Sequence, residues 1–137
     1  MANEFARRRQ DADVNPAAIA LPAAASTAIN TASIDIGAGD FLPQLEFEIQ
    51  APVLNTTQLP DTRTVTYLVA DSANDSSFAT IYDSVLVQTG ASGAGAAAAN
   101  ARFSLPAETR RYIRVTATTG ASTGDCSAVT VSLVALF

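Results

Sequence analysis

Apolar and polar residues alternate along much of the chain. In the segment 44–50, Leu45, Phe47 and Ile49 alternate with glutamine and glutamate. A period of two predicts a β-strand with one buried face and one solvated face. The same alternation recurs in the segments 62–70, 110–118 and 128–137. These segments form the framework of the predicted fold.

Shorter segments rich in β-forming residues lie between these strands, at 29–36, 78–82, 84–88 and 100–105. Gly, Pro, Asn and Asp residues cluster between them, as expected for turns. No strong amphipathic helix intervenes, which argues against a βαβ fold. The pattern predicts an all-β protein, a single β-sandwich or jelly-roll domain of about eight antiparallel strands. This domain is expected to span residues 26–137.

Residues 1–25 differ in composition from the rest of the chain. They begin with charged residues and continue as an alanine-rich run interrupted by Pro16 and Pro22. The prolines exclude one continuous helix, and the segment has too few large apolar side chains to fold alone. We expect an extended N-terminal arm that is ordered by contact with a partner.

The composition excludes most catalytic chemistry. The chain contains neither histidine nor lysine, and Cys126 is its single cysteine. Without histidine there is no Ser-His-Asp triad and no imidazole metal ligand, and without lysine there is no Schiff base. One cysteine forms neither an internal disulfide nor a thiolate cluster. We expect a protein that is not an enzyme and that has no cofactor and no bound metal.

The chain is acidic, with 137 residues and a formal net charge of −5. Three arginines balance three acids in residues 1–25, so the negative charge lies on the body of the protein. A negative body repels nucleic-acid phosphates and anionic lipids. No segment has the apolar length of a signal sequence or membrane span. We expect neither a nucleic-acid partner nor a membrane partner, and synthesis in a cytoplasm.

Glu46 and Glu48 share the polar face of the strand at 44–50. Paired carboxylates act as acid and base in glycosidases, but such pairs need a cleft. The alternatives are a solvated strand face and a docking face for arginines of a neighbouring subunit. All three interpretations are compatible with the pattern.

Two clusters of arginines are candidates for contacts. Arg7, Arg8 and Arg9 lie in the expected arm. There they form a salt-bridging tether to an acidic neighbour, a nucleic-acid contact or a solvated tail. Arg111 and Arg114 flank an aromatic residue at the start of a predicted strand. This arrangement favours local stacking or an interface.

The segment 89–99 consists only of Gly, Ala, Ser and Thr. Its Gly93 and Gly95 match part of a dinucleotide-binding fingerprint, which also needs a following helix and an acid about 20 residues later. Thr118 stands near that position, and Pro106 would end a helix early. We predict a small-residue loop rather than a nucleotide site.

Several dispersed motifs carry a resemblance to a known family. They are Asp35-Ile36-Gly37, the strand at 45–49, Thr64–Val69, Phe103–Pro106 and Arg111–Val115. Together they resemble the capsid cement, or decoration, proteins of tailed bacteriophages, in particular the family typified by the cement protein of a Bordetella podovirus. The resemblance covers roughly residues 29–136.

The resemblance implies a β-sandwich or jelly roll on the outer surface of an icosahedral head, made in the host bacterial cytoplasm. Such a protein clamps neighbouring major capsid subunits and stabilises the shell, and we expect it to self-associate as a trimer. No family motif is catalytic. The residues that we expect to contact the capsid or a partner are Phe5, Arg7, Arg8, Arg9, Glu46, Glu48, Arg111 and Arg114.

The alternative is a non-enzymatic β-sandwich that binds a carbohydrate or a host surface, as fibre and lectin-like domains do. Such sites favour exposed Trp, Tyr and His side chains. The chain has no Trp and no His, which disfavours this alternative.

Overall fold

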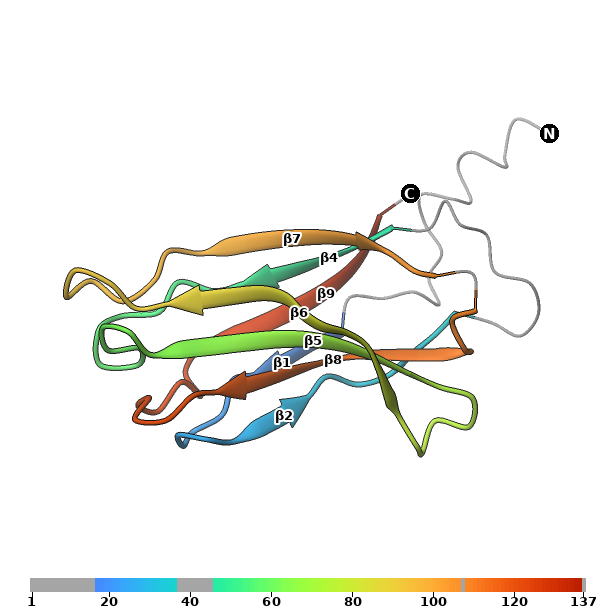
Figure 1. Cartoon of the computed structure of the whole chain (residues 1–137), viewed down its shortest axis with the longest axis horizontal. Coiled ribbons are helices and arrows are strands. Elements are labelled where there is room, and N and C mark those ends of the chain that lie inside the picture. Colours follow the sequence, from blue (N-terminus) through green and yellow to red (C-terminus); the bar gives the residue numbers. More distant parts are fainter. Residues whose placement is uncertain (1–16, 37–45, 107, 137) are drawn as a thin grey trace.

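The computed structural model describes residues 17–36, 46–106 and 108–136, which form nine β-strands and no helix (Figure 1). The strands are β1 (Ala17–Ala20), β2 (Ala28–Asn30), β3 (Ile34–Asp35), β4 (Glu46–Ala51), β5 (Thr64–Ser72), β6 (Ala79–Thr89), β7 (Ala99–Ser104), β8 (Tyr112–Thr119) and β9 (Thr130–Leu136). The four segments with the clearest alternation correspond to β4, β5, β8 and β9. The predicted all-β class is confirmed for this part of the chain.

The strands form two antiparallel sheets that pack face to face as a β-sandwich (Figure 1). Sheet A has four strands in the order β1-β9-β4-β7. Sheet B has five strands, in the order β2-β8-β5-β6 with β3 also paired to β8. Because β2 and β3 pair with successive parts of β8, they occupy one strand position. The sandwich therefore has the predicted number of positions, about eight.

The strand pairing is nested. The first strand, β1, pairs with the last, β9, and the β2/β3 position pairs with β8. Inside these pairs, β4 pairs with β7, and β5 pairs with β6. This first-with-last order, divided between two sheets, is the arrangement of a jelly roll. Contacts between residues that are far apart in the sequence therefore dominate the fold.

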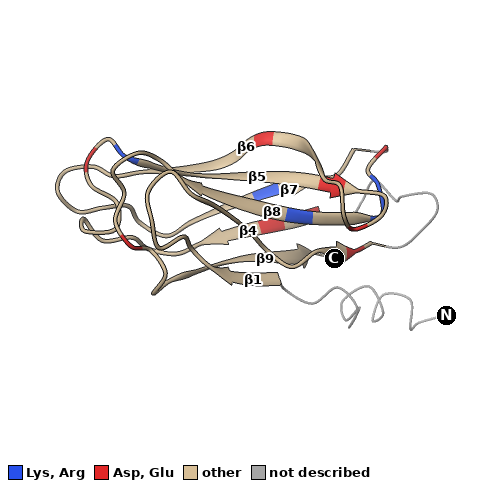
Figure 2. Cartoon of the chain, turned by 90° about the horizontal axis from the view of Figure 1, so that it is seen from below, with Lys and Arg blue, Asp and Glu red and all other residues tan. Residues whose placement is uncertain are grey.

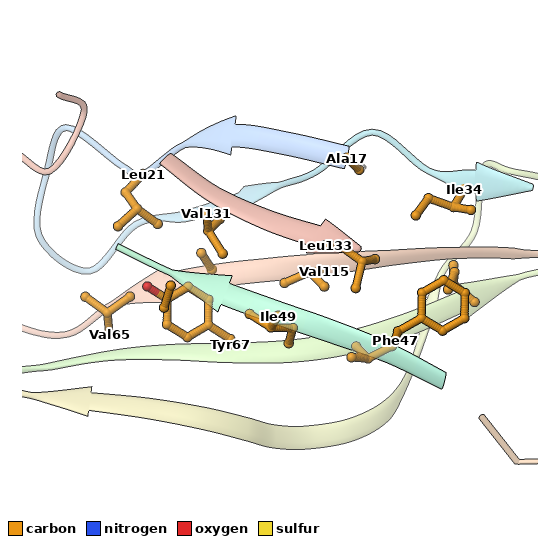
Figure 3. Close-up of a cluster of buried hydrophobic side chains, with 14 of the residues drawn as sticks. Ala17, Leu21, Ile34, Phe47, Ile49, Val65, Tyr67, Val115, Val131 and Leu133 are labelled. Carbon is orange, nitrogen blue, oxygen red and sulfur yellow. The ribbon is translucent and has the colours of Figure 1, made fainter. Parts of the chain in front are cut away.

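The core lies between the sheets and is built from the apolar positions of the alternating strands (Figure 3). Phe47 and Ile49 of β4 face Tyr67 of β5 and Val115 of β8, and all four are fully buried. Burying each side chain contributes about 1.5 to 3 kcal/mol. The alternation that predicted these strands thus reflects a real division between a core face and an outer face.

Aromatic and polar contacts complete the core at the edge formed by β6 and β7. The rings of Phe47 and Phe103 stack with centroids 5.9 Å apart, and Tyr82 meets Phe103 edge-on at 6.0 Å. The Tyr82 hydroxyl donates to the Ser104 carbonyl at 2.7 Å, which links the edges of the two sheets. Edge strands are protected when they are covered in this way.

The N-terminal strand β1 corrects the expected boundary between arm and domain. Ala17 pairs with Leu133 and Ile19 pairs with Val131 across the β1–β9 ladder, and Leu21 is only 1% exposed. Residues 17–25 therefore belong to the sandwich, and the expectation that the arm continues to residue 25 is wrong for them. Their small side chains suit a short edge strand, which composition alone did not reveal. Residues 1–16 lie outside the described residues.

One end of the sandwich, here called the glycine end, consists of the segments 52–63, 90–98 and 120–128. Its loops pack backbone against backbone. The Gly124 amide donates to the Gln58 carbonyl at 2.9 Å, and Leu54 and Ala96 exchange two backbone hydrogen bonds of 2.9 Å. The side chain of Gln88 donates to the carbonyls of Pro52 and Ala97. This end contains the predicted small-residue loop, which is ordered by these contacts.

Candidate interaction surface

The opposite end of the sandwich, here called the arginine end, comprises residues 72–78 and 108–114 with the adjoining strand termini. Arg110, Arg111 and Arg114 lie there, at or near the start of β8. Figure 2 shows that most charged positions lie on the half of the sandwich where β8 begins. The charge that the sequence distributes sparsely is therefore concentrated by the fold.

Arg110 is bound by Asp71, the penultimate residue of β5. Its Nε and Nη2 atoms donate to Asp71 Oδ1 at 3.1 and 2.7 Å, and its backbone amide donates to Oδ2 at 2.8 Å. Burial opposes ionisation of Asp71, but the hydrogen bonds and charge of Arg110 outweigh it, so the pKa of this carboxyl lies below its ordinary value. This pair fixes the segment before β8 to the end of β5.

Arg111 forms a second pair, with Asp35 of β3. Its Nε and Nη2 atoms reach the two carboxylate oxygens at 2.8 Å each. The guanidinium carbon also lies 5.2 Å from the centroid of the Tyr112 ring. Both charged side chains remain more than 40% exposed, so water competes with the pair and its contribution to stability is small.

Arg114 differs from its two neighbours. Its guanidinium carbon lies 3.8 Å from the centroid of the Phe78 ring, close enough for the planar group to stack on the ring. Its Nε is buried without a hydrogen-bond partner, and no ion pair of Arg114 occurs among the described residues. Arg114 points away from the core, because its neighbours Ile113 and Val115 are fully buried.

A carboxylate on the outer face of sheet A is satisfied within the chain. Glu48 accepts from Arg102 Nε at 3.0 Å and from Gln50 Nε2 at 2.9 Å. These hydrogen bonds lower the pKa of Glu48. A general acid needs a raised pKa, so Glu48 is unsuited to the role of the acid.

The predicted contact residues do not form one cluster. Arg114 lies on the outer face of sheet B and Arg111 precedes the first residue of β8, whereas Glu48 lies on sheet A beside the exposed Glu46. The structure brings Arg111 together with Asp35, and Glu48 with Arg102. Their roles as partner contacts stay predictions. The expected arm contacts, which are Phe5, Arg7, Arg8 and Arg9, lie outside the described residues.

The sequence did not identify the partners of these side chains. Asp71 and Arg110 are 39 positions apart, and Asp35 and Arg111 are 76 positions apart. Only the nested strand order places them together. Phe78 was included in a predicted strand, but nothing in its neighbourhood predicted that it would support Arg114.

Within residues 17–36, 46–106 and 108–136, no group of three or more His, Cys, Asp or Glu side chains could hold a metal ion. The same part of the chain contains no helix of the length and apolarity needed to cross a membrane. In comparisons with known proteins, no family model and no curated protein matches this sequence.

Proposed function

We propose that this chain is a structural virion protein. It is a cement, or decoration, protein on the outer surface of a tailed-phage icosahedral head, where it clamps neighbouring major capsid subunits and stabilises the shell. The observation that carries the proposal is that the resemblance motifs occupy paired strands of one jelly roll. Thr64–Val69 lies in β5, Arg111–Val115 leads into β8, and these strands pair in the centre of sheet B.

The fold suits a protein that acts by position rather than by chemistry. Both sheets are antiparallel, and the glycine end is fixed by backbone hydrogen bonds. Viral capsid proteins are one group that uses the jelly roll, although a fold by itself does not define a function. A rigid module repeated over a lattice converts weak single contacts into strong attachment.

The proposed arm is residues 1–16, which precede the edge strand β1. Because β1 pairs with β9 on one side of sheet A, the preceding residues join the domain at a sheet edge. From there an extended segment can add to the sheet of a neighbour. In this proposal Phe5, Arg7, Arg8 and Arg9 contact an adjacent capsid subunit or a second copy within a trimer.

Co-sedimentation with expanded phage heads that lack the protein tests this proposal. Saturable binding at a fixed ratio to the major capsid subunit supports it, and the native mass of the free protein reports whether a trimer forms first. A stable monomer that binds no such shell would contradict it. Specific signals in a glycan array would then support the lectin-like alternative, since jelly rolls also occur in lectins.

Two truncations test the arm separately from the domain. Removal of residues 1–16 leaves β1 and Leu21 in place, so the protein should stay folded but bind heads at least tenfold more weakly. Removal of residues 1–25 also deletes β1 and the buried Leu21, and should lower the midpoint of thermal unfolding. Unchanged head occupancy after the shorter truncation would refute the role of the arm.

A further inference from the structure

We infer that Arg114, stacked on Phe78, is a receptor for a single carboxylate side chain of a partner protein. The site lies on the outer face of sheet B at the arginine end. The inference that this site binds a carboxylate depends only on the geometry described above. The inference that the site contacts the capsid rests in addition on the proposed function.

The Phe78 ring orients the guanidinium of Arg114, which forms no hydrogen bond with the described residues. Phe78 lies under it at 3.8 Å, and an arginine has five N–H donors in a fixed plane. Nε is the donor atom of Arg114 that is both buried and without a partner. The two terminal nitrogens make no hydrogen bond to the described protein and keep contact with solvent. Because the protein covers Nε, the terminal nitrogens are the donors that a partner can reach.

Two neighbours of Arg114 across sheet B have small side chains. Ala70 of β5 lies directly opposite in the ladder and is 4% exposed, although it belongs to the outer face. Its neighbour across the next ladder is Thr80 of β6. Side chains as small as these leave room beside the guanidinium for a two-oxygen acceptor.

Charge favours one carboxylate over a more highly charged ligand. Asp71 neutralises Arg110, and Asp35 neutralises Arg111. Among the described residues at the arginine end, Arg114 is the arginine that forms no ion pair. A carboxylate carries one charge and matches the two parallel N–H groups of a guanidinium. A polyanion such as nucleic acid would be repelled by the net charge of −5.

The occupant is therefore an aspartate or glutamate on an exposed segment of a partner protein. Stacking on Phe78 reduces the freedom that Arg114 would lose on binding, which favours association. The pair would form at a partly desolvated surface, where an ion pair is stronger than in open water. Within the proposed function, this partner is the acidic side chain of a capsid subunit.

Nuclear magnetic resonance of the arginine Nε–H groups tests the site without any capsid. The probe is acetyl-Ala-Glu-Ala-amide, and acetyl-Ala-Gln-Ala-amide is the matched neutral control. Arg114→Lys identifies the Arg114 signal by its loss. We expect this signal to shift saturably with a dissociation constant of about 1 to 10 mM for the Glu peptide, and at least tenfold weaker binding of the Gln peptide.

The exposed Arg63, at the opposite end of sheet B, is the internal reference. Equal shifts at Arg63 and Arg114, or equal effects of the two peptides, would overturn the inference. Phe78→Leu keeps the arginine but removes the ring. It should weaken Glu-peptide binding severalfold while the protein remains folded, and an unchanged affinity would show that stacking does not prepare the site.

Head binding by the full-length protein separates the two proposals. Arg114→Lys should bind heads at least tenfold more weakly, whereas Arg63→Lys should bind within twofold of the wild type. A Glu-peptide shift at Arg114 in a protein that binds no heads would support the carboxylate site and refute the proposed function. Heads bound equally by wild type and Arg114→Lys would refute Arg114 as the capsid contact.

Discussion

The loops at the two ends of the sandwich are held in place by different interactions. At the glycine end, loops meet mainly through neutral backbone groups, as in the hydrogen bond from the Gly124 amide to the Gln58 carbonyl, with one contact from the Gly93 amide to the Asp61 carboxylate. At the arginine end, loops are attached through charged side chains, Asp71 with Arg110 and Asp35 with Arg111. Where backbones pack this closely, as at Gly95, an added Cβ would clash, whereas charged side chains can exchange a partner inside the chain for one outside it.

This difference assigns the two ends different roles. The glycine end buries Cys126, whose thiol lies 3.6 Å from the carbonyl oxygens of Gln58 and Gly124. It forms a closed cap on the core. The arginine end leaves Arg114 without a charged partner among the described residues. Stability should therefore depend most on the glycine end, and partner binding most on the arginine end.

Gly95→Ala should have the largest effect on stability. Gly95 has φ +70°, and an added Cβ would lie 2.0 Å from the backbone oxygen of Leu54. A backbone atom cannot move aside, so we expect a loss of about 3 kcal/mol or more in the free energy of unfolding. Urea unfolding measures this loss.

Gly93→Ala is the matched control for this prediction. Gly93 has a similar φ of +64°, but an added Cβ would meet nothing within 4 Å. Its cost should be the backbone strain alone, about 1 kcal/mol. Equal destabilisation by the two variants would show that close backbone approach does not hold the glycine end together.

The rate at which Cys126 reacts with a thiol reagent reports local unfolding of the glycine end. Burial, together with the nearby charge of Asp125, raises the pKa of this thiol, so it should react slowly with a thiol reagent in the native protein. Gly95→Ala should accelerate the reaction at least tenfold, because it loosens the surrounding loops. Asp71→Asn, at the other end, should leave the rate within twofold of the wild type.

Asp71→Asn should have a moderate effect on stability. The Asp71 side chain is 11% exposed, and the substitution removes the charge that receives three hydrogen bonds from Arg110. Arg110 is 40% exposed and can return to water. We therefore expect a loss of about 1 to 2 kcal/mol, less than for a fully buried pair. Thermal unfolding at neutral pH should resolve it, and an unchanged midpoint would contradict it.

Acid should remove the contribution of the Asp71–Arg110 pair to the free energy of unfolding. The folded-state pKa of Asp71 is lowered, so its contribution is complete above the unfolded carboxyl value of about 4. It is lost as the pH falls through the folded-state value. The stability difference between wild type and Asp71→Asn should be constant near neutral pH and shrink in acid. Urea titrations down to about pH 2 measure this, and a difference that grows in acid would contradict the assignment.

Arg111→Gln should have the smallest effect. The pair with Asp35 is exposed on both sides, so water replaces what the substitution removes. We expect no resolvable change in the midpoint of urea unfolding. A loss as large as that of Asp71→Asn would mean that side-chain exposure does not predict how much an ion pair at the arginine end contributes to stability.

Much of the fold followed from the sequence, because burial imposes its period on each strand. Phe47 and Ile49 were expected on one face, and both are fully buried. The edge strand β1 was missed, since its residues Ala-Ala-Ile-Ala show no alternation between apolar and polar types. The special role of Gly95 was also missed, because it depends on Leu54, which is distant in the sequence.

Less of the candidate site could be predicted. Arg111 and Arg114 were singled out by their clustering, but their different environments depend on which strands become neighbours of β8. Asp35 reaches Arg111 from β3, and Phe78 reaches Arg114 from the position before β6. Such pairings follow from nested topology, which local patterns do not encode.

Thermal release of DNA from filled heads tests the proposed cement role most directly. Heads that lack the protein are heated with and without saturating amounts of the full-length chain, and exposed DNA is followed with an intercalating dye. Binding across neighbouring subunits should shift release to a higher temperature, in proportion to occupancy. Release at the same temperature from bare heads and from fully occupied heads would contradict the cement role.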